Sequence, residues 1–292
     1  MVGVGVLALA KSSYGWFAPK SLRLEDVFTE NRCVVYTYNE GGGDGDAVAV
    51  WQQSWEAAGW TPIVLNEQHA ALHPNYQDYR DYFLTLPTPN TPQYELSCYL
   101  RHAAMSVVGG GLMTDYDVVN VNVPPPPNCD TLPNNGALTT HDNHVPSIIS
   151  GNKEAYDALL EGMRHTDWNV VMVGTGQNHL SDMIFTLYFG YVSEPRLVTC
   201  SLTYSHRPNE MASPPCTEDG TATPMIFHFS HVCIADAYGG AYRAGVMGGE
   251  WARLTEEVKQ CKPLNFDAQS YPVTLWKTVD GESSTVLANQ FL

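Results

Sequence analysis

The stretch CVVYTYNEGGGDGDAVAVWQQSWEAAGWTPIVLN (33–66) reads as a strand, a helix and a second strand. Its ends, 33–39 and 61–66, are rich in β-branched and aromatic side chains, and 47–60 carries apolar residues at helical spacing. Asp46 is placed to cap the helix. Because the joins are short, the three segments form a βαβ unit. The sequence therefore predicts an α/β fold with a mainly parallel central sheet flanked by helices.

The same alternation continues along the chain. We expect a helix over 94–108, whose apolar residues at i, i+3 and i+4 spacing form an inward face. A Pro-rich loop follows at 123–136, and a late strand is expected at 224–231. No linker requires two domains, so residues 1–292 are predicted to form a single domain with an N-terminal extension at 1–30.

The charge and composition of the chain exclude some classes of binding partner. The formal net charge is −16, so the surface repels nucleic-acid backbones, and no nucleic-acid partner is expected. An anionic substrate has to be received by a few local basic residues or through a divalent cation. The apolar opening of ten residues is too short to cross a bilayer, so no membrane span is expected. The chain has seven cysteines and no C-x-x-C pair, which leaves one or two disulfides possible.

Two D-x-D triplets contain paired carboxylates, which could bind a divalent cation. Asp44 and Asp46 lie in a glycine loop before a helix, where capping explains them. Asp115 and Asp117 lie in GGGLMTDYDVVNVN (109–122), against a strand-like run, and we expect both to be exposed in a cleft at the carboxyl end of a strand. In an extended segment both carboxylates face one side, about 7 Å apart, and can bind Mg²⁺ or Mn²⁺. The alternative is a solvated turn, and the glycines allow close approach of a ligand.

The segment YELSCYLRHAAMSVVGGGLMTDYDVV (94–119) resembles the helix–Gly-Gly–D-x-D block of glycosyltransferases with the GT-A fold. It is most similar to the DXD-motif sugar transferases of the initiating α-mannosyltransferase and α-galactosyltransferase type. Arg101 matches their arginine, Gly109 or Gly110 their glycines, and Asp115 and Asp117 their aspartates. Cys98 replaces an aspartate of that pattern.

The resemblance implies a GT-A-like, Rossmann-related fold with a nucleotide-binding half at 31–122 and an acceptor-side half with a C-terminal tail at 123–292. It implies an enzyme that moves a sugar from a UDP- or GDP-sugar to a carbohydrate or glycoconjugate acceptor, with retention of configuration favoured. Mn²⁺ or Mg²⁺ would be its cofactor. Both the cytoplasm and the secretory pathway, including the Golgi lumen, remain open as compartments.

The resemblance also implies roles for particular residues. Asp115 and Asp117 hold the metal, and Asp115 and Gly110 contact the donor. The loop that begins at Asn39 receives the nucleotide, with Tyr36 or Tyr38 stacking on the base, although core packing is the stronger interpretation for at least one tyrosine. Arg101 orients Asp115 or meets the diphosphate; the alternative is a surface salt bridge.

Further candidates lie later in the chain. Asp182 contacts the donor sugar or the acceptor, or else Ser181 or Asp182 caps a helix. His228 or His231 completes the metal site. If 224–231 is a strand, only one of the two can face inward, and we expect His228 near Asp117 and His231 turned away. HDNH (141–144) is a metal-binding loop or, in the favoured interpretation, a set of acceptor-side polar residues.

Two other classes of function remain. A metal-dependent hydrolase or nucleotidyltransferase would use Asp115, Asp117 and the HDNH cluster. A non-catalytic carbohydrate-binding protein would keep the fold and bind no nucleotide. Binding of UDP or GDP together with Mn²⁺ separates both classes from a transferase.

Overall fold

A computed structural model describes residues 33–41, 45–142, 145–192, 198–199, 204–205 and 215–263. The described residues belong to one compact unit that begins at Cys33. The expected extension at 1–30, Asp44 and the Asn143–His144 half of HDNH lie outside the described residues. The single domain and its two halves stay predictions.

The predicted βαβ unit is present. Strand β1 (Val34–Tyr38) is followed by helix α2 (Gly45–Ala57) and strand β2 (Thr61–Leu65), and the two strands pair in parallel. Asp46 lies inside the first turn of α2 rather than at its cap, so the capping expectation is wrong. A carboxylate there still interacts favourably with the helix dipole.

The central sheet has the strand order β2-β1-β3-β6-β5-β7. Of its six described strands only β6 runs against the others, so the predicted α/β class with a mainly parallel sheet is confirmed. Successive residues of the central strands alternate between the two faces. Val35 and Leu112 pack toward α2, whereas Tyr36 and Met113 pack toward the helices on the opposite face. The further strands of this sheet are β3 (Gly110–Thr114), β5 (Thr139–Asp142), β6 (Val145–Asn152) and β7 (Val198–Thr199).

A small second sheet lies beside the first. It contains β4 (Val118–Asn120), β8 (Tyr204–Ser205) and β9 (Ile226–His228) in the order β4-β9-β8. The strand expected over 224–231 therefore ends at His228. The Ser230 side chain accepts a hydrogen bond from the Cys233 backbone N–H, and this cap starts a helix at His231.

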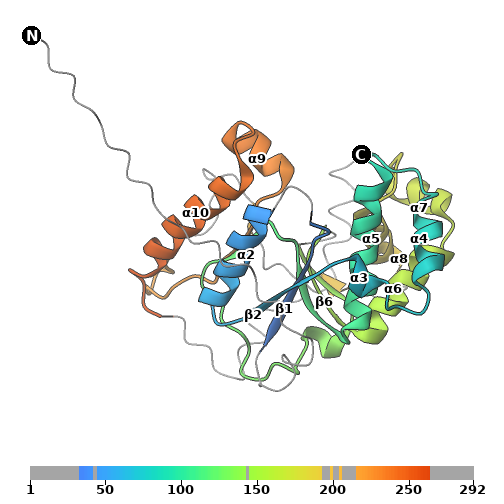
Figure 1. Ribbon diagram of the computed structural model, residues 1–292. Helices are drawn as coiled ribbons and strands as arrows, with labels where there is room; N and C mark the ends of the chain where they lie inside the picture. Colours follow the sequence, from blue (N-terminus) through green and yellow to red (C-terminus); the bar gives the residue numbers. More distant parts are fainter. Residues whose placement is uncertain are drawn as a thin grey trace, which may run out of the picture. The chain divides into compact units, whose positions relative to one another are not determined.

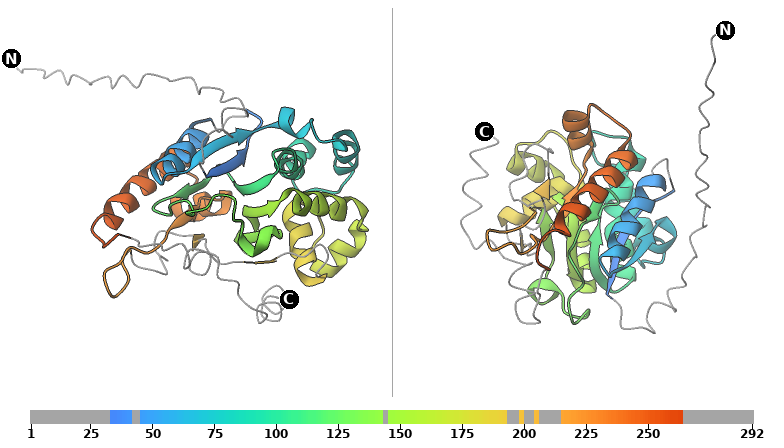
Figure 2. Two further views of the ribbon diagram at one scale, coloured as in Figure 1. Left: turned by 90° about the horizontal axis from the view of Figure 1, so that it is seen from below. Right: turned by 90° about the vertical axis from the view of Figure 1, so that its left-hand side faces the viewer.

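Helices cover both faces of the central sheet (Figures 1 and 2). Helix α10 packs beside α2, and α5 and α6 pack together on the other face. Helix α5, expected over 94–108, is Pro92–Val107 and is buried along most of its length. The remaining helices are α3 (Glu67–Ala70), α4 (Tyr76–Phe83), η1 (Pro133–Gly136), α6 (Lys153–His165), α7 (Trp168–Thr175), α8 (Asp182–Val192), α9 (His231–Tyr238) and α10 (Arg243–Val258).

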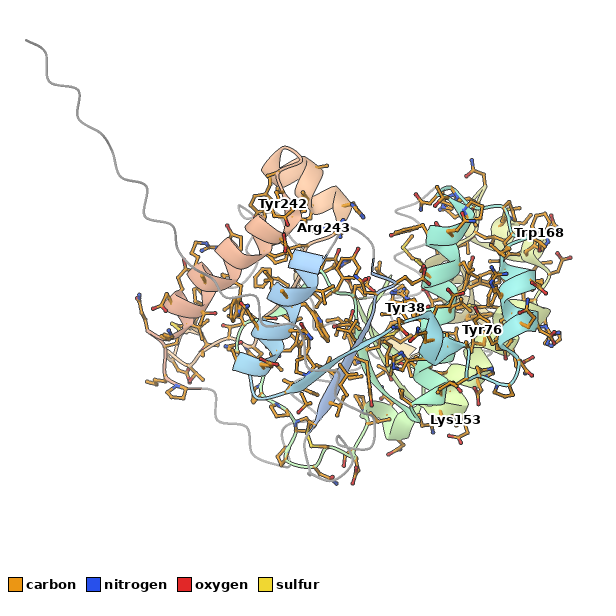
Figure 3. The ribbon with its side chains drawn as sticks, in the orientation of Figure 1. Tyr38, Tyr76, Lys153, Trp168, Tyr242 and Arg243 are labelled. Atoms are coloured by element: carbon orange, nitrogen blue, oxygen red, sulfur yellow. A yellow bond between two sulfur atoms is a disulfide. The ribbon has the colours of Figure 1, made fainter. Side chains whose placement is uncertain are left out.

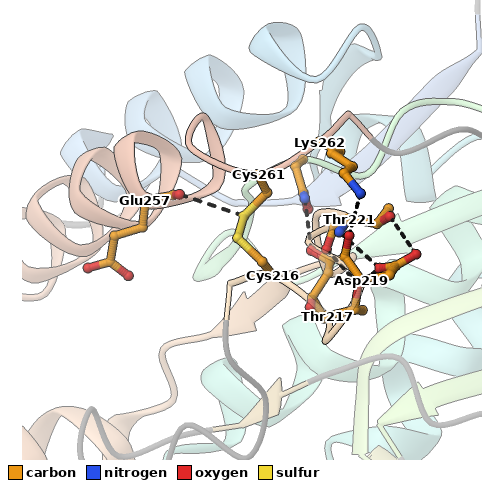
Figure 4. The surroundings of a disulfide bond; sticks show 9 residues. Cys216, Thr217, Asp219, Thr221, Glu257, Cys261 and Lys262 are labelled. Atoms are coloured by element: carbon orange, nitrogen blue, oxygen red, sulfur yellow. Dashed lines mark hydrogen bonds between the residues drawn. A yellow bond between two sulfur atoms is a disulfide. The ribbon is translucent and has the colours of Figure 1, made fainter.

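Two disulfides join distant parts of the chain. Cys33 at the start of β1 pairs with Cys129 in the Pro-rich loop, and Cys216 pairs with Cys261 beyond α10 (Figure 4). Cys98, on helix α5, is a free thiol. The sequence left one or two disulfides possible, and the described cysteines form two. None of the helices in the described ranges is both long and apolar enough to cross a bilayer.

Gly110 is required by the packing of β3 on β6. Its φ is +88°, and a Cβ there would lie 2.4 Å from the Gly151 carbonyl oxygen. Gly109 also has a positive φ, +91°, but a Cβ there would meet nothing within 4 Å. The two neighbours therefore share the same backbone constraint and differ in the space around them.

We predict that Gly110→Ala destabilises the protein by about 1–3 kcal/mol more than Gly109→Ala, because only the first variant forces β3 and β6 apart. Chemical denaturation of both variants measures the difference. Equal losses of stability would show that the backbone conformation, and not the contact with β6, requires glycine at 110.

Candidate functional site

The D-x-D lies in a turn at the carboxyl end of β3. Thr114 ends the strand, and the Val118 backbone N–H donates to the Asp115 carbonyl oxygen at 3.1 Å before β4 begins. The expectation of an extended segment is therefore wrong, whereas the expected position at the end of a strand is confirmed. The turn brings the two carboxylates closer together than an extended chain would. Asp117 is also buried, at 6% exposure, so the expectation that both aspartates are exposed is wrong for this residue.

Two tryptophans of α2 hold this turn on both sides. The Trp51 indole N–H donates to Thr114 Oγ1 at 2.8 Å, and the Trp55 indole N–H donates to the Val118 carbonyl oxygen at 3.0 Å. Both side chains are fully buried. Because the two residues are one helical turn apart, a single face of α2 fixes the residues directly before and after the D-x-D.

His228 reaches the turn from β9. Strand β9 pairs with β4 so that His228 lies opposite Val118. One ligand atom each from Asp115, Asp117 and His228 lies within 4.8 Å of the other two. His228 Nε2 is 3.6 Å from Asp117 Oδ1. The structure therefore brings together a possible divalent-metal site from three residues that the sequence named.

The electrostatics of this group fit a cation. Burial raises the pKa of Asp117, opposed by the neighbouring His228, and Asp117 Oδ1 has no hydrogen-bond donor. A buried carboxylate oxygen without a donor is costly unless a cation meets it. Burial tends to lower the pKa of His228, but Asp117 and then Asp142 outweigh it and raise that pKa to about 9. Once a metal displaces the proton of His228, two carboxylates and one imidazole form a donor set that suits a divalent ion.

Asp142 orients His228. Its Oδ2 accepts a hydrogen bond from Ser147 Oγ at 2.8 Å and lies 3.1 Å from His228 Nδ1. This contact leaves Nε2 as the nitrogen on the side of Asp117. The sequence singled out Asp142 only as part of HDNH, and the separation of 86 residues from His228 hid its partner. His141 turns elsewhere, because its Nε2 lies 3.1 Å from Ser150 Oγ in the buried core.

Arg101 links the D-x-D to α8. From α5 its guanidinium donates to Asp115 and, at 2.9 Å from Nε, to Asp182, which also lies 3.1 Å from His102 Nε2. Arg101 is buried, so the alternative of a surface salt bridge is wrong. Burial would raise the pKa of Asp182, but Arg101 and then His102 outweigh it and lower that pKa. Ser181 Oγ accepts from the Ile184 backbone N–H at 3.3 Å, so the capping role falls to Ser181.

His231 and Arg243 border the same site. His231 does not turn away, as the strand interpretation required, because it begins helix α9 instead of continuing β9. Its Nε2 is 2.6 Å from an Nη of Arg243, whose other Nη donates to Asp117 Oδ2 at 3.0 Å. The sequence did not identify Arg243, which lies 126 residues from its partner and in no recognisable motif.

A pocket of about 270 Å³ opens in front of these groups. This volume lies just below the usual range for small-molecule sites. It is lined by Tyr38, Asn90, Tyr94, Glu95, Ser97, Cys98, Arg101, Asp115, Tyr116, Asp117, Val145, Pro146, Ser181, Asp182, Met183, His231 and Arg243.

Three of the predicted donor-binding residues do not line that pocket. Tyr36 and Tyr38 both belong to the buried core that contains α5, but only Tyr38 also lines the pocket. The Asn39 side chain accepts a hydrogen bond from the Gly41 backbone N–H at 2.6 Å. Gly110 begins β3, at the opposite end of the strand from Asp115, and approaches β6 rather than a ligand.

No protein-family model matches the chain, and no curated protein matches its sequence. Among solved structures, it is similar to a glycosyltransferase involved in the glycosylation of the major capsid of PBCV-1. The similarity has 10% sequence identity and a TM-score of 0.36, and it covers 75% of this chain and 99% of that one. The chemistry of the site therefore rests on its own residues.

We predict that Asp142→Ala weakens Mn²⁺ binding about 10-fold or more, because His228 loses the contact that orients its ring. Asp142→Asn keeps an oxygen acceptor and should retain most of the affinity. Isothermal titration with Mn²⁺ measures both variants, with the exposed Asp130→Ala as control. An Asp142→Ala protein that binds Mn²⁺ as tightly as the parent would remove Asp142 from the site.

Proposed function

We propose that the protein is a metal-dependent glycosyltransferase that moves a sugar from a UDP- or GDP-sugar to a hydroxyl of a carbohydrate or glycoconjugate acceptor. The observation that carries this proposal is the D-x-D turn, which lies at the carboxyl end of a central strand and beside His228. A pocket with two arginines opens directly in front of it. The likeness of residues 94–119 to the D-x-D block of GT-A enzymes supports the same function.

Asp115, Asp117 and His228 would hold Mn²⁺ or Mg²⁺. Carboxylates suit both ions, and the imidazole favours Mn²⁺, which is the softer of the two. The bound ion would neutralise the charge that develops on the leaving nucleoside diphosphate. In a protein with a net charge of −16, such a cation also makes a diphosphate acceptable.

Three further residues that line the pocket, Arg101, Tyr38 and Asp182, would position the metal ligands and the substrates. Arg101 fixes Asp115 from the buried side and holds Asp182 at the wall of the pocket. Of the two tyrosines, Tyr38 would be the one to stack on a nucleotide base, since both belong to the buried core but only Tyr38 also lines the pocket. Asp182 would contact the donor sugar or the acceptor through the face it turns to the pocket.

Retention of configuration stays the favoured outcome. An inverting transferase needs a general base to take the proton of the acceptor hydroxyl. Asp182 suits that role poorly, because Arg101 and His102 stabilise its ionised form and make it a weak base.

The disulfides favour one of the two compartments that the sequence left open. Disulfides persist in oxidising environments and are rare in the cytosol. Cys33–Cys129 and Cys216–Cys261 therefore support the secretory pathway as the place where the protein works.

A thermal-shift screen of UDP-, GDP- and CMP-sugars, each with and without Mn²⁺, tests the function. We expect a UDP- or GDP-sugar to stabilise the protein only when Mn²⁺ is present, by about 2.7 kcal/mol at a ligand concentration about a hundred times Kd. Stabilisation by a CMP-sugar without metal, or by no nucleotide at all, would contradict the proposal and favour one of the other two classes.

Asp117→Asn should abolish the Mn²⁺-dependent part of this stabilisation, because it removes the charge of a ligand and keeps the shape of the buried side chain. Asparagine is preferred to alanine, since Asp117 is buried between His228 and Arg243. Asp81→Asn, on the exposed face of α4, is the matched control. A shift that survives in Asp117→Asn would place the metal elsewhere.

A further inference from the structure

Arg243 occupies a position that the metal and the substrate both need. It is the first residue of α10 and lines the pocket, with a side chain only 10% exposed (Figure 3). Its guanidinium donates to Asp117 Oδ2 and to His231, and its carbon lies 6.0 Å from the centre of the Tyr116 ring. The residue thus places a permanent positive charge against one of the three candidate metal ligands.

The helix itself gains nothing from an arginine at this position. The positive end of the helix dipole lies at the N-terminus, where basic side chains are unfavourable. The first turn of α10 contains no acidic residue, and Tyr242 provides no side-chain cap. The guanidinium is therefore held by its contacts with Asp117, His231 and Tyr116, of which only Asp117 carries a negative charge.

That ion pair conflicts with a bound metal. Asp117 has two oxygens: Arg243 contacts Oδ2, and Oδ1 faces His228 without a hydrogen-bond donor. A divalent ion held by Asp115, Asp117 and His228 would lie close to the guanidinium, and the two cations would repel each other through a poorly screened, buried region. Metal binding consequently weakens the hold of Asp117 on Arg243.

We propose that Arg243 changes partner when the donor binds. In the empty site it neutralises Asp117; once Asp117 ligates the metal, the guanidinium turns to the diphosphate of the nucleotide. The planar fork of arginine binds phosphate oxygens in pairs, and the pocket that Arg243 lines is where the diphosphate would lie. This inference rests on the proposed function and assigns the diphosphate a ligand from the protein besides the metal.

If Arg243 exchanges Asp117 for the diphosphate, removing its guanidinium should change the affinities for the metal and for the nucleotide in opposite directions. Without the guanidinium, the metal no longer competes with a cation for Asp117, so the metal binds more tightly. Without it the diphosphate loses a charged donor, so the nucleotide binds less tightly. If the ion pair were merely structural, its loss would weaken the binding of the metal and of the nucleotide together.

Arg243→Met tests this, since methionine keeps an unbranched apolar stem and removes the charge. Isothermal titration should show Mn²⁺ alone binding at least about fivefold more tightly than to the parent. At saturating Mn²⁺, UDP or GDP should bind about 10- to 100-fold more weakly. Arg253→Met is the matched control, because Arg253 lies on the same helix, outside the pocket, and pairs with Glu250 and Glu257.

Arg243→Lys keeps the positive charge but lacks the planar guanidinium that binds two phosphate oxygens. It provides a second test if the methionine variant does not fold. We expect parent-like Mn²⁺ affinity and weaker nucleotide binding. Unchanged nucleotide binding in both Arg243 variants, or weaker Mn²⁺ binding in Arg243→Met, would overturn the exchange. A parent protein that binds Mn²⁺ but neither UDP nor GDP would instead contradict the proposed function.

Discussion

Two buried indole N–H groups hold the candidate site in place. Trp51 and Trp55 are one turn apart on α2, and they donate to Thr114 and to Val118, on either side of the D-x-D. A buried indole N–H without a partner is costly, so these bonds fix α2, β3 and β4 relative to one another. They also close the turn that brings Asp115 and Asp117 together. The position of the carboxylates thus depends on a helix more than 50 residues earlier in the chain.

Around this turn the charges are balanced in pairs. Arg101 contacts Asp115 from α5, and Arg243 contacts Asp117 from α10. His228 lies between Asp117 and Asp142. Asp115 and Asp117 are therefore each matched by an arginine from a different helix. On the proposal made above, a metal ion that entered this arrangement would displace existing charge contacts, and the arginine released in this way would be available to an anionic ligand. An acidic protein would receive a diphosphate by this route.

The sequence predicted the fold where local patterns suffice. The βαβ unit, helix α5 and the position of the D-x-D after a strand follow from periodicity and spacing in segments of a few tens of residues. Arg243 was not predicted, because its partner Asp117 lies 126 residues away and no local pattern marks it. Asp142 was named only as part of HDNH, because its partner His228 lies 86 residues away. The start of helix α9, by contrast, could have been predicted from the sequence. Ser230 directly after FHF could have been recognised as an N-cap, which ends the strand before His231.

We propose that Asp115, Asp117 and His228 form a metal centre. Anomalous diffraction at the manganese edge, from crystals grown with Mn²⁺ and UDP or GDP, locates the ion itself. We expect one strong peak at roughly 2.0–2.3 Å from a carboxylate oxygen of each aspartate and from His228 Nε2. A peak beside Asp46 or in the HDNH loop, with none between these three residues, would contradict it.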